Sequence, residues 1–391
     1  MTSEWNHSTI NDVCVLVTDG SHSSPKSVND GKYMVSVKDF TDYGFDFASC
    51  RMISNDDYET LKRNGCVPQI DDILIGKDGA RFFEDIIIYR QREKPALLSS
   101  IAILRCDKSK ILPDFLYYVL RTPSFRQDVK DNYGSGSAIP RIILKDFKRM
   151  MVSYPSLEKQ QAIISVLTAI DSKIQANTEI NDNLADLLQT IYQGRFGNDI
   201  FAVNQGVLSD ICSYSTDKVA VSELNVRTYF STENMLSGKA GSTEATSLPT
   251  TSQTTACHKG DTLISNIRPY FKKIVYCEDK CGCSTDVLCF TPSQPCYSAY
   301  LFSTLYADKF FAFMVAGSKG TKMPRGDKQQ IMTYPVVLPS EEELAGFNTI
   351  ASPLLEQIYS NRAENKRLSI LRDTLLPKLM SGEINVSAIQ L

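Results

Sequence analysis

The chain has 391 residues, enough for two or three domains, and its 22% of charged residues is typical of globular proteins. With 42 Lys and Arg against 45 Asp and Glu, the net charge of −3 does not indicate nucleic-acid binding. Such binding would need basic residues concentrated on one face, or a partner that supplies the charge. The sequence contains no run of 18 apolar residues, so no membrane span is predicted, and the N-terminus lacks the features of an export signal. Eleven cysteines in such a chain favour reduced thiols and a cytoplasmic protein.

Residues 1–154 are predicted to form a mixed α/β domain. Short apolar segments at 73–75, 86–89 and 97–104 are typical of strands. A helix is predicted to begin near Pro113, because proline is favoured in the first turn.

Two loops of this domain carry cations. The loop at 76–81 follows the first of these strands and contains Lys77 and Arg81. The segment 133–141 is rich in glycine and serine and ends in proline followed by Arg141. Such a sequence predicts a flexible loop that closes with a fixed turn and a positive charge.

A long helix is predicted from Ser156 to about Arg195. Apolar or amide side chains recur there in alternating steps of four and three, a heptad pattern typical of one long helix packed on another. About 39 residues at a rise of ~1.5 Å would span roughly 58 Å. The pattern consists of Ile163, Leu167, Ile170, Ile174, Asn177, Asn181, Leu184, Leu188 and Ile191.

Residues 198–338 repeat the plan of the first domain with different side chains. Leu208–Cys212 corresponds to Ile10–Cys14, and a helix over 300–313 matches the one that begins near Pro113. The segment from Asp261 to Tyr270 takes the place of the strand and loop from Asp72 to Arg81. The loops of this second domain, 198–338, contain the cations Arg268, Lys272, Lys273, Lys319, Lys322 and Arg325.

A second long helix is predicted from Ser340, where Ser340 and Glu343 can form a capping box. Adding 184 to the first heptad positions gives Phe347, Ala351, Leu354, Ile358, Asn361, Asn365, Leu368, Arg372 and Leu375.

Two of these positions fit the heptad pattern poorly. They are Ala351 and Arg372, and the neighbouring Ile350 and Leu371 are candidates to take their places. The repeat nevertheless predicts two equal helices that pack on each other. An asparagine pair at the same positions in both favours a fixed register over partial exposure on a surface helix.

Motifs for catalysis are missing from the sequence. There is no phosphate-binding loop of the Gly-x4-Gly-Lys-Ser/Thr kind, and three histidines form no evident triad. The segment 266–270 superficially resembles the catalytic motif of amino-methyltransferases, but it has an extra residue and an arginine in place of a tight proline turn. A stand-alone methyltransferase or nuclease is therefore disfavoured.

A group of cysteines allows two interpretations, a metal site or buried free thiols. Their spacing contains no Cys-x2-Cys knuckle, which favours buried thiols over a metal. The group comprises Cys277, Cys281, Cys283, Cys289 and Cys296, with Cys257 and His258 upstream.

The order of these parts resembles the specificity subunit of type I restriction-modification systems, over essentially the whole chain. Each of two variable domains precedes a long helix, which opens with Pro155–Gln160 or Leu338–Glu343. Further matches are 72–79, 264–270, 376–384 and the Gly/Ser loop before Pro-Arg in each half. The acidic start of the second helix departs from the Leu-Glu-x-Gln that is usual in the family.

The resemblance implies an α/β (α+β) fold with a pseudo-twofold internal repeat. Two target recognition domains, 1–154 and 198–338, would be separated by two long antiparallel coiled-coil helices, 155–197 and 339–384, with 385–391 as a tail. Each domain would recognise one part of a bipartite double-stranded DNA target. The helix pair would set the gap and dock two modification (methyltransferase) subunits, and restriction/translocase subunits would join them.

The same resemblance implies a non-catalytic chain without a cofactor or metal. S-adenosylmethionine, ATP and Mg would belong to the partner subunits. A methylation-only system and a coiled-coil adaptor that does not bind DNA remain as alternatives.

Loop residues of both halves are the candidates for DNA contacts, because Arg and Lys can pair with phosphates or guanine edges. Any one of them could instead be an ordinary solvated charge. The candidates are Lys77, Arg81, Ser135, Ser137, Arg141, Arg268, Lys272, Lys273, Lys319, Lys322 and Arg325. The residues predicted to hold the helix pair are Leu167, Ile170, Ile174, Asn177, Asn181, Leu184, Leu354, Ile358, Asn361, Asn365 and Leu368.

Overall fold

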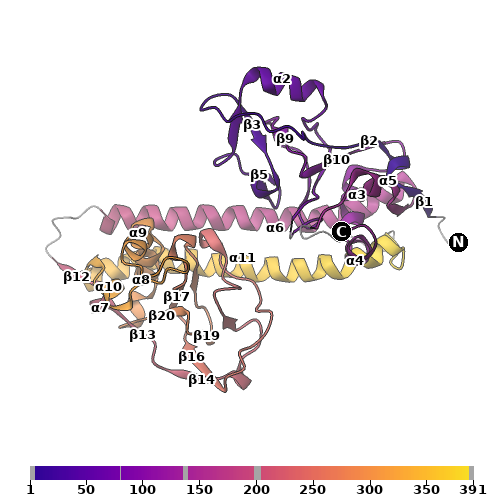
Figure 1. Cartoon of the computed structure of the whole chain (residues 1–391). Helices are drawn as coiled ribbons and strands as arrows, with labels where there is room; N and C mark the ends of the chain where they lie inside the picture. The colour runs from indigo at the N-terminus through magenta and orange to yellow at the C-terminus, as the bar shows by residue number, and fades with distance from the viewer. Residues whose placement is uncertain (1–4, 80, 135–139, 198–203, 387–391) are drawn as a thin grey trace. The chain divides into compact units, whose positions relative to one another are not determined.

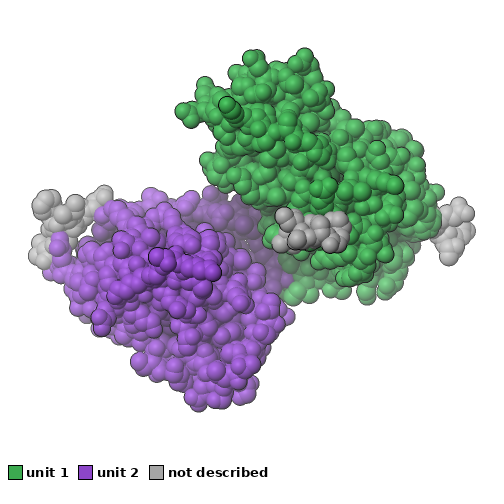
Figure 2. Space-filling model, viewed as in Figure 1, with its two compact units in different colours: residues 1–173, 367–391 green, residues 174–366 purple. Residues whose placement is uncertain are grey.

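The computed structural model describes residues 5–79, 81–134, 140–197 and 204–386 (Figure 1). The chain divides into two compact units, which Figure 2 colours separately. Unit 1 comprises residues 1–173 and 367–391, and unit 2 comprises residues 174–366. Each unit contains a β-rich domain and part of each long helix.

The main sheet of unit 1 has four antiparallel strands. Alternate residues along its strands point to opposite faces, as the pleat requires. One face contributes Ile73, Ile75 and Leu104 to the largest apolar cluster of the unit, and the other face contributes Leu74 and Ile103 to a separate cluster. The strands, in spatial order, are β2 (Cys14–Asp19), β10 (Ile101–Cys106), β7 (Ile73–Gly76) and β8 (Ile86–Ile88).

Shorter strands complete unit 1. A three-stranded sheet has the order β6 (Arg51–Ile53), β3 (Lys32–Val35) and β9 (Ala96–Leu97). Two antiparallel pairs are formed by β4 (Phe40–Thr41) with β5 (Gly44–Phe45), and by β1 (Asn6–Thr9) with β11 (Met151–Tyr154).

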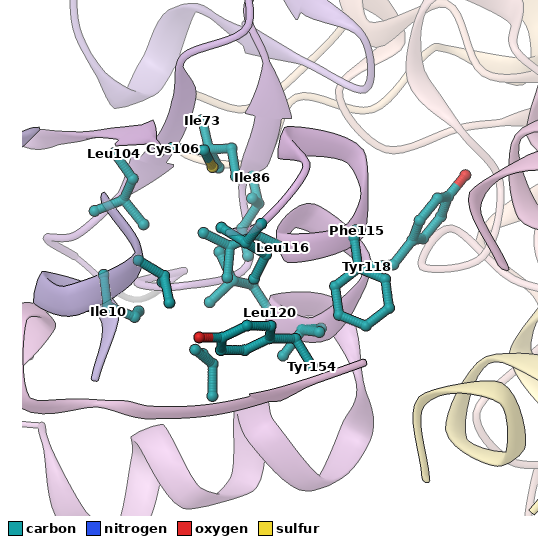
Figure 3. Packing of buried hydrophobic residues seen from close by; sticks show 14 of the residues in the cluster. Ile10, Ile73, Ile86, Leu104, Cys106, Phe115, Leu116, Tyr118, Leu120 and Tyr154 are labelled. Atoms are coloured by element: carbon teal, nitrogen blue, oxygen red, sulfur yellow. The ribbon is translucent and has the colours of Figure 1, made fainter. Parts of the chain in front are cut away.

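Helices cover one face of the main sheet of unit 1. Figure 3 shows Phe115, Leu116 and Leu120 of α3 packed with Ile10 and Leu104. Pro113 occupies the first turn of α3, as predicted. These helices are α1 (Ile10–Val13), α3 (Pro113–Arg121), α4 (Pro123–Asn132) and α5 (Leu144–Arg149), whereas α2 (Asn55–Arg63) packs on the three-stranded sheet.

Unit 2 repeats this plan. Its main sheet again has four antiparallel strands, whose alternate residues enter two separate apolar clusters. In spatial order they are β13 (Cys212–Tyr214), β20 (Val287–Pro292), β17 (Thr262–Ser265) and β18 (Ile274–Tyr276). The smaller sheet has the order β14 (Lys218–Ala220), β16 (Gln253–Cys257), β19 (Cys281–Cys283) and β15 (Tyr229–Phe230), and β12 (Gln205–Val207) pairs with β21 (Pro335–Val337).

The short helices of unit 2 also correspond to those of unit 1. The sequence predicted one helix over 300–313, and this is wrong, because the backbone at Ala307 is extended and starts a second helix. Thr122 separates α3 from α4 in the same way. The helices are α7 (Leu208–Ile211), α8 (Ser298–Tyr306), α9 (Asp308–Ala316) and α10 (Lys328–Met332).

A predicted strand over 97–104 is also wrong. The structure has two strands there, β9 and β10, which belong to different sheets. A turn separates them, in which the amide of Ile101 donates to the carbonyl of Leu98 at 3.0 Å.

The two long helices are α6 (Leu157–Tyr192) and α11 (Glu341–Ser381). The predicted capping box of α11 is confirmed, because the amide of Glu343 donates to Ser340 Oγ at 3.2 Å and the amide of Ser340 donates to Glu343 Oε2 at 2.8 Å. Within unit 2, Asn177 Nδ2 donates to Asn365 Oδ1 and Asn361 Nδ2 donates to Asn181 Oδ1, both at 2.9 Å. Partner numbers rise on one helix as they fall on the other, so the helices are antiparallel.

The remaining heptad residues lie in the apolar interiors or at their margins. The buried members are Ile163, Leu167, Ile170, Leu188, Phe347 and Ile358. The partly covered members are Ile174, Leu184, Ile191, Leu354, Leu368 and Leu375.

Two predicted replacements in the heptad pattern are wrong. Ala351 is fully buried, whereas its neighbour Ile350 is 38% exposed. Arg372 lies within unit 1 as a partner of Asp171, whereas Leu371 is 47% exposed. Ala351 and Arg372 themselves thus occupy the seam, which is the line of heptad positions along the two long helices. The alanine is closely packed there, and the charge of Arg372 is paired with Asp171.

Candidate nucleic-acid interface

Two loops of unit 1 are joined by backbone hydrogen bonds at the end of β7. The amide of Gly79 donates to the carbonyl of Pro140 at 3.0 Å, and the amide of Ile142 donates to the carbonyl of Lys77 at 3.0 Å. Between these bonds, Asp78 and Arg141 form an isolated antiparallel bridge. The sequence predicted both loops as separate segments, and the structure brings them together.

Unit 2 has the same arrangement at the end of β17. The amide of Arg268 donates to the carbonyl of Pro324 at 2.8 Å, and the amide of Gly326 donates to the carbonyl of Asn266 at 3.3 Å. Ile267 and Arg325 form the corresponding bridge. We call these two assemblies, residues 76–79 with 140–142 and residues 265–268 with 324–326, the paired loops.

An exposed arginine stands at the same position in each pair of loops, Arg141 in unit 1 and Arg325 in unit 2. Arg325 Nη2 lies 3.0 Å from Asp286 Oδ1, a contact that holds the guanidinium in one orientation. The backbone bridges fix where each arginine leaves the main chain. A guanidinium fixed in this way can recognise a phosphate or the O6 and N7 atoms of guanine.

Arg268 has an unusual backbone conformation. Its φ of 50° lies in the left-handed region, which side chains other than glycine seldom adopt. Gly79 occupies the equivalent position in unit 1, also with a positive φ, and there it causes little strain. The Nε of Arg268 is buried without a hydrogen-bond partner among the described residues.

Lys77 lies in the interior rather than on the loop surface. Its side chain is 8% exposed, and Nζ lies 3.3 Å from Asp19 Oδ2, which is equally buried. A buried charge requires such a partner. This placement favours a structural role for Lys77 beneath the paired loops over direct contact with a ligand.

The other predicted cations are mostly engaged by acidic neighbours at the surface. Arg81 Nη2 lies 2.6 Å from Asp85 Oδ1, Lys272 Nζ lies 3.0 Å from Asp308 Oδ1, and Lys319 pairs with Asp327. Hydrogen bonds from Lys239 and Lys272 lower the pKa of Asp308. Lys322 is exposed. Surface pairs of this kind are weak enough for a phosphate to displace the carboxylate.

Lys273 differs from these surface cations, because its Nζ donates to the carbonyl of Thr232 at 2.6 Å. Burial lowers the pKa of this amine. Ser135 and Ser137 lie outside the described residues.

Two exposed aromatic residues beside Arg268 were missed as candidates. Tyr270 is 50% exposed and Phe271 is 38% exposed, and their ring centroids lie 4.8 Å apart. Exposed aromatic rings between cations are a signal for nucleic-acid binding that the sequence contained.

The cysteine group lies inside unit 2. Cys257, Cys277, Cys281, Cys283 and Cys289 are buried in one apolar cluster, with Cys277 Sγ and Cys281 Sγ 3.6 Å apart. Cys296 is exposed and stands apart from them. Within the described ranges, no three His, Cys, Asp or Glu side chains are arranged to hold a metal ion. The thiols pack as small apolar residues, as the spacing favoured.

Nor does the described part of the chain contain a helix with the length and apolar character needed to cross a lipid bilayer.

Comparisons with known proteins agree with this architecture. A family model described as the type I restriction modification DNA specificity domain matches residues 2–185. The specificity subunit of the type I restriction enzyme MjaIX from Methanocaldococcus jannaschii is 24% identical over 323 residues, 71% of each chain. The HindI specificity subunit from Haemophilus influenzae is 26% identical over 98 residues, 24% of this chain and 21% of that protein.

A solved structure shares the fold over almost the whole chain. The crystal structure of the S subunit of a type I restriction-modification system from M. genitalium superposes with a TM-score of 0.56 at 18% identity, covering 97% of this chain and 96% of that one. Both have β-rich domains joined by two long helices that pack together. Residues 2–185 thus match the DNA specificity domain of type I restriction-modification systems, and the chain shares the fold of an S subunit of such a system over almost its whole length.

Proposed function

We propose that this chain is the specificity subunit of a type I restriction-modification system, and that each of its units recognises one part of a split double-stranded DNA sequence through its paired loops. Specificity subunits are non-catalytic, so the chain contributes the choice of sequence to the complex. The observation that supports two recognition sites is the repetition of the paired loops, with the same backbone bonds and an exposed arginine at the same position. Around them the side chains differ, which suits two different half-targets.

The second part of the proposal is that α6 and α11 set the gap between the half-targets. Both helices are continuous from one unit into the other, which favours a fixed spacer over a flexible linker. The two cross-helix asparagine pairs support a fixed register. Half-sites on one side of DNA would then have centres about one helical turn apart, ~34–36 Å.

The third part is that the long helices dock two modification subunits, which carry the methyltransferase sites. Ile180 and Leu187 of α6 are 45% and 46% exposed and are separated by seven residues, so they share one face of the helix. On α11, Ile370 and Leu371 are 49% and 47% exposed. Exposed apolar residues on helices suit protein contacts. S-adenosylmethionine, ATP and Mg would be bound by the modification and restriction/translocase subunits.

A methylome tests the two-part target. The chain would be expressed with its modification subunit in a methylation-free host, and the DNA would be sequenced by a method that detects methyladenine. We expect a split motif with a modified adenine in each part. A single continuous motif would contradict the two-site proposal. Absence of methylation, with a modification subunit shown to be active, would favour the adaptor alternative.

Substitution of the equivalent arginines tests the loops. Arg141→Ala and Arg325→Ala should each weaken binding of the target by about 10-fold or more, since a bidentate contact or a phosphate contact is lost. Binding would be measured with the modification subunit present at several salt concentrations. Arg63→Ala, on the exposed surface of α2, is the matched control and should leave the affinity unchanged. Unchanged affinity and salt dependence in both loop variants would exclude these loops.

A further inference from the structure

A polar pocket of about 330 Å³ lies beside the paired loops of unit 2. Three separate segments of the chain line it, 229–234, 243–249 and 284–286. Its lining contains three carboxylates, Glu233, Glu244 and Asp286, and several hydroxyl groups. The pocket is large enough to enclose the edge of a small planar group, and its three carboxylates are hydrogen-bond acceptors only, while its hydroxyl groups can donate or accept.

The three carboxylates differ in their partners. Glu244 Oε1 lies 3.1 Å from Arg227 Nε and 2.7 Å from Lys366 Nζ, which together lower its pKa. Asp286 is held by Arg325. Glu233 is exposed and has no cation within ion-pair distance among the described residues. Glu233 is therefore the carboxylate that remains available to a ligand.

The pocket is continuous with the candidate DNA surface. Asp286 belongs to the pocket wall and also orients Arg325 of the paired loops. On another side, the carbonyl of Thr232, a wall residue, accepts the hydrogen bond of Lys273. Two cations of the candidate surface thus contact residues of the pocket wall, which also carries carboxylates. This combination suits DNA, whose phosphates require cations and whose bases present donors as well as acceptors.

We propose that this pocket recognises a DNA base by its exocyclic amino group, with Glu233 as the acceptor. The proposal rests on the proposed function, since it names how unit 2 distinguishes one base pair of its half-target. In the major groove, cytosine N4 and adenine N6 are the amino donors, whereas guanine O6 and N7 and thymine O4 are acceptors that a carboxylate repels. Glutamate contacts cytosine N4 in particular.

Arg325 and Glu233 then have complementary roles. Arg325 donates hydrogen bonds and suits guanine, while Glu233 accepts them and suits an amino group. Glu233 and Asp286 line the same pocket, and Asp286 positions the arginine. A neighbouring donor and acceptor can distinguish the two bases of a pair by their opposite hydrogen-bonding patterns.

The test uses Glu233→Gln, which preserves size but adds two donors and removes the charge. Methylomes of the wild type and the variant would be compared in the complete complex with the modification subunit. We expect one base position in the unit 2 part of the motif to become degenerate, while the part read by unit 1 is unchanged. In binding assays with every base at that position, wild-type discrimination of roughly 10-fold or more should fall severalfold.

Two controls separate this role from simple charge. Glu223→Gln removes an acidic residue of the same unit outside the pocket, where it pairs with Lys280, and should leave the motif unchanged. If Glu233 only repelled phosphate, Glu233→Gln would tighten binding to all sequences equally without changing the motif, and this result would overturn the proposal. Ser284→Ala, a second change in the wall, should relax the same position.

Failure of the proposal differs from failure of the proposed function. A split wild-type motif that Glu233→Gln and Ser284→Ala leave intact would refute the pocket alone. A wild-type motif without a part read by unit 2 would refute the two-part target, and the pocket with it.

Discussion

The two units use different chemistry at the same place on the helix pair. In unit 1, Asp171 of α6 accepts hydrogen bonds from the Tyr118 hydroxyl at 2.7 Å and from Arg372 Nη1 at 2.9 Å. The repeat offset of 184 residues places Leu355 of α11 and Leu188 of α6 at the corresponding positions in unit 2, and both are buried. A hydrogen-bonded charge pair in one unit thus stands where apolar contacts stand in the other.

This difference shows what the fold requires at the seam. The position must be filled and its polar groups must be paired, but the chemistry that achieves this can differ. The two solutions do not combine well, since an aspartate facing a leucine would be left without its partner. We therefore expect the difference to disfavour wrong pairing between the two halves of the repeat, as polar groups do in coiled coils.

The largest effect is expected from Leu188→Ala in unit 2. Leu188 is 1% exposed and packs in the apolar cluster with Tyr192 and Leu355. Its truncation should lower the free energy of unfolding by about 3 kcal/mol, measured by urea denaturation. The adjacent Leu187 is 46% exposed, so Leu187→Ala is a matched control with an expected loss below about 0.5 kcal/mol. Equal effects of the two variants would contradict the assignment of the seam.

A smaller effect is expected from breaking the charge pair in unit 1. Arg372 and Asp171 are 18% and 19% exposed, so water partly screens a partner left alone. Either Asp171→Ala or Arg372→Ala should therefore cost about 2 kcal/mol, less than for a fully buried pair. The double variant Asp171→Leu with Arg372→Leu installs the chemistry of unit 2. It should unfold within about 1 kcal/mol of the wild type, and a loss as large as the sum of the single variants would refute the equivalence.

The repeat itself could be predicted from the sequence, because it appears as a regular pattern. The heptad steps, the asparagine pairs and the cap at Ser340 depend on residues close together in the chain, and the structure contains each of them. The break at Ala307 could not be found in this way. Apolar residues continue on both sides of it, so periodicity gives no sign that the helix ends.

The candidate site was predictable only in part, for a related physical reason. Lys77 comes directly after β7, and Arg268 comes shortly after the end of β17. The sequence near Lys77 does not show that this side chain is buried, because its burial depends on a partner, Asp19, that is far away in the chain. The pocket beside Arg325 is made by three segments that approach each other only in the folded chain. Local sequence indicates which side chains a loop carries, whereas burial and partners depend on tertiary contacts.

The asparagines occur at matching positions of both long helices, and their role in fixing the register can be tested. Replacing Asn181 and Asn361 together by leucine removes both members of one hydrogen-bonded pair. The Gln357 amide, which donates to Asn361 Oδ1 at 2.7 Å, is exposed and can bond to water instead. Stability should rise by about 1 kcal/mol, since apolar pairs replace a costly polar one. If the pair fixes the register, the variant should also bind targets whose gap differs from that of the wild type. Unchanged gap preference would show that the pair has no role in spacing.

The smallest effect is expected where unit 2 has an arginine and unit 1 a glycine. Arg268 and Gly79 hold equivalent positions with positive φ, so Arg268→Gly should relieve strain and stabilise the protein by about 1 kcal/mol. Gly79→Ala should destabilise by a similar amount. DNA affinity should nevertheless fall in Arg268→Gly, because a cation of the paired loops is lost. Thermal unfolding and binding of the same variant would show whether strain is retained for recognition. If stability and affinity both fell, the arginine would have a structural role.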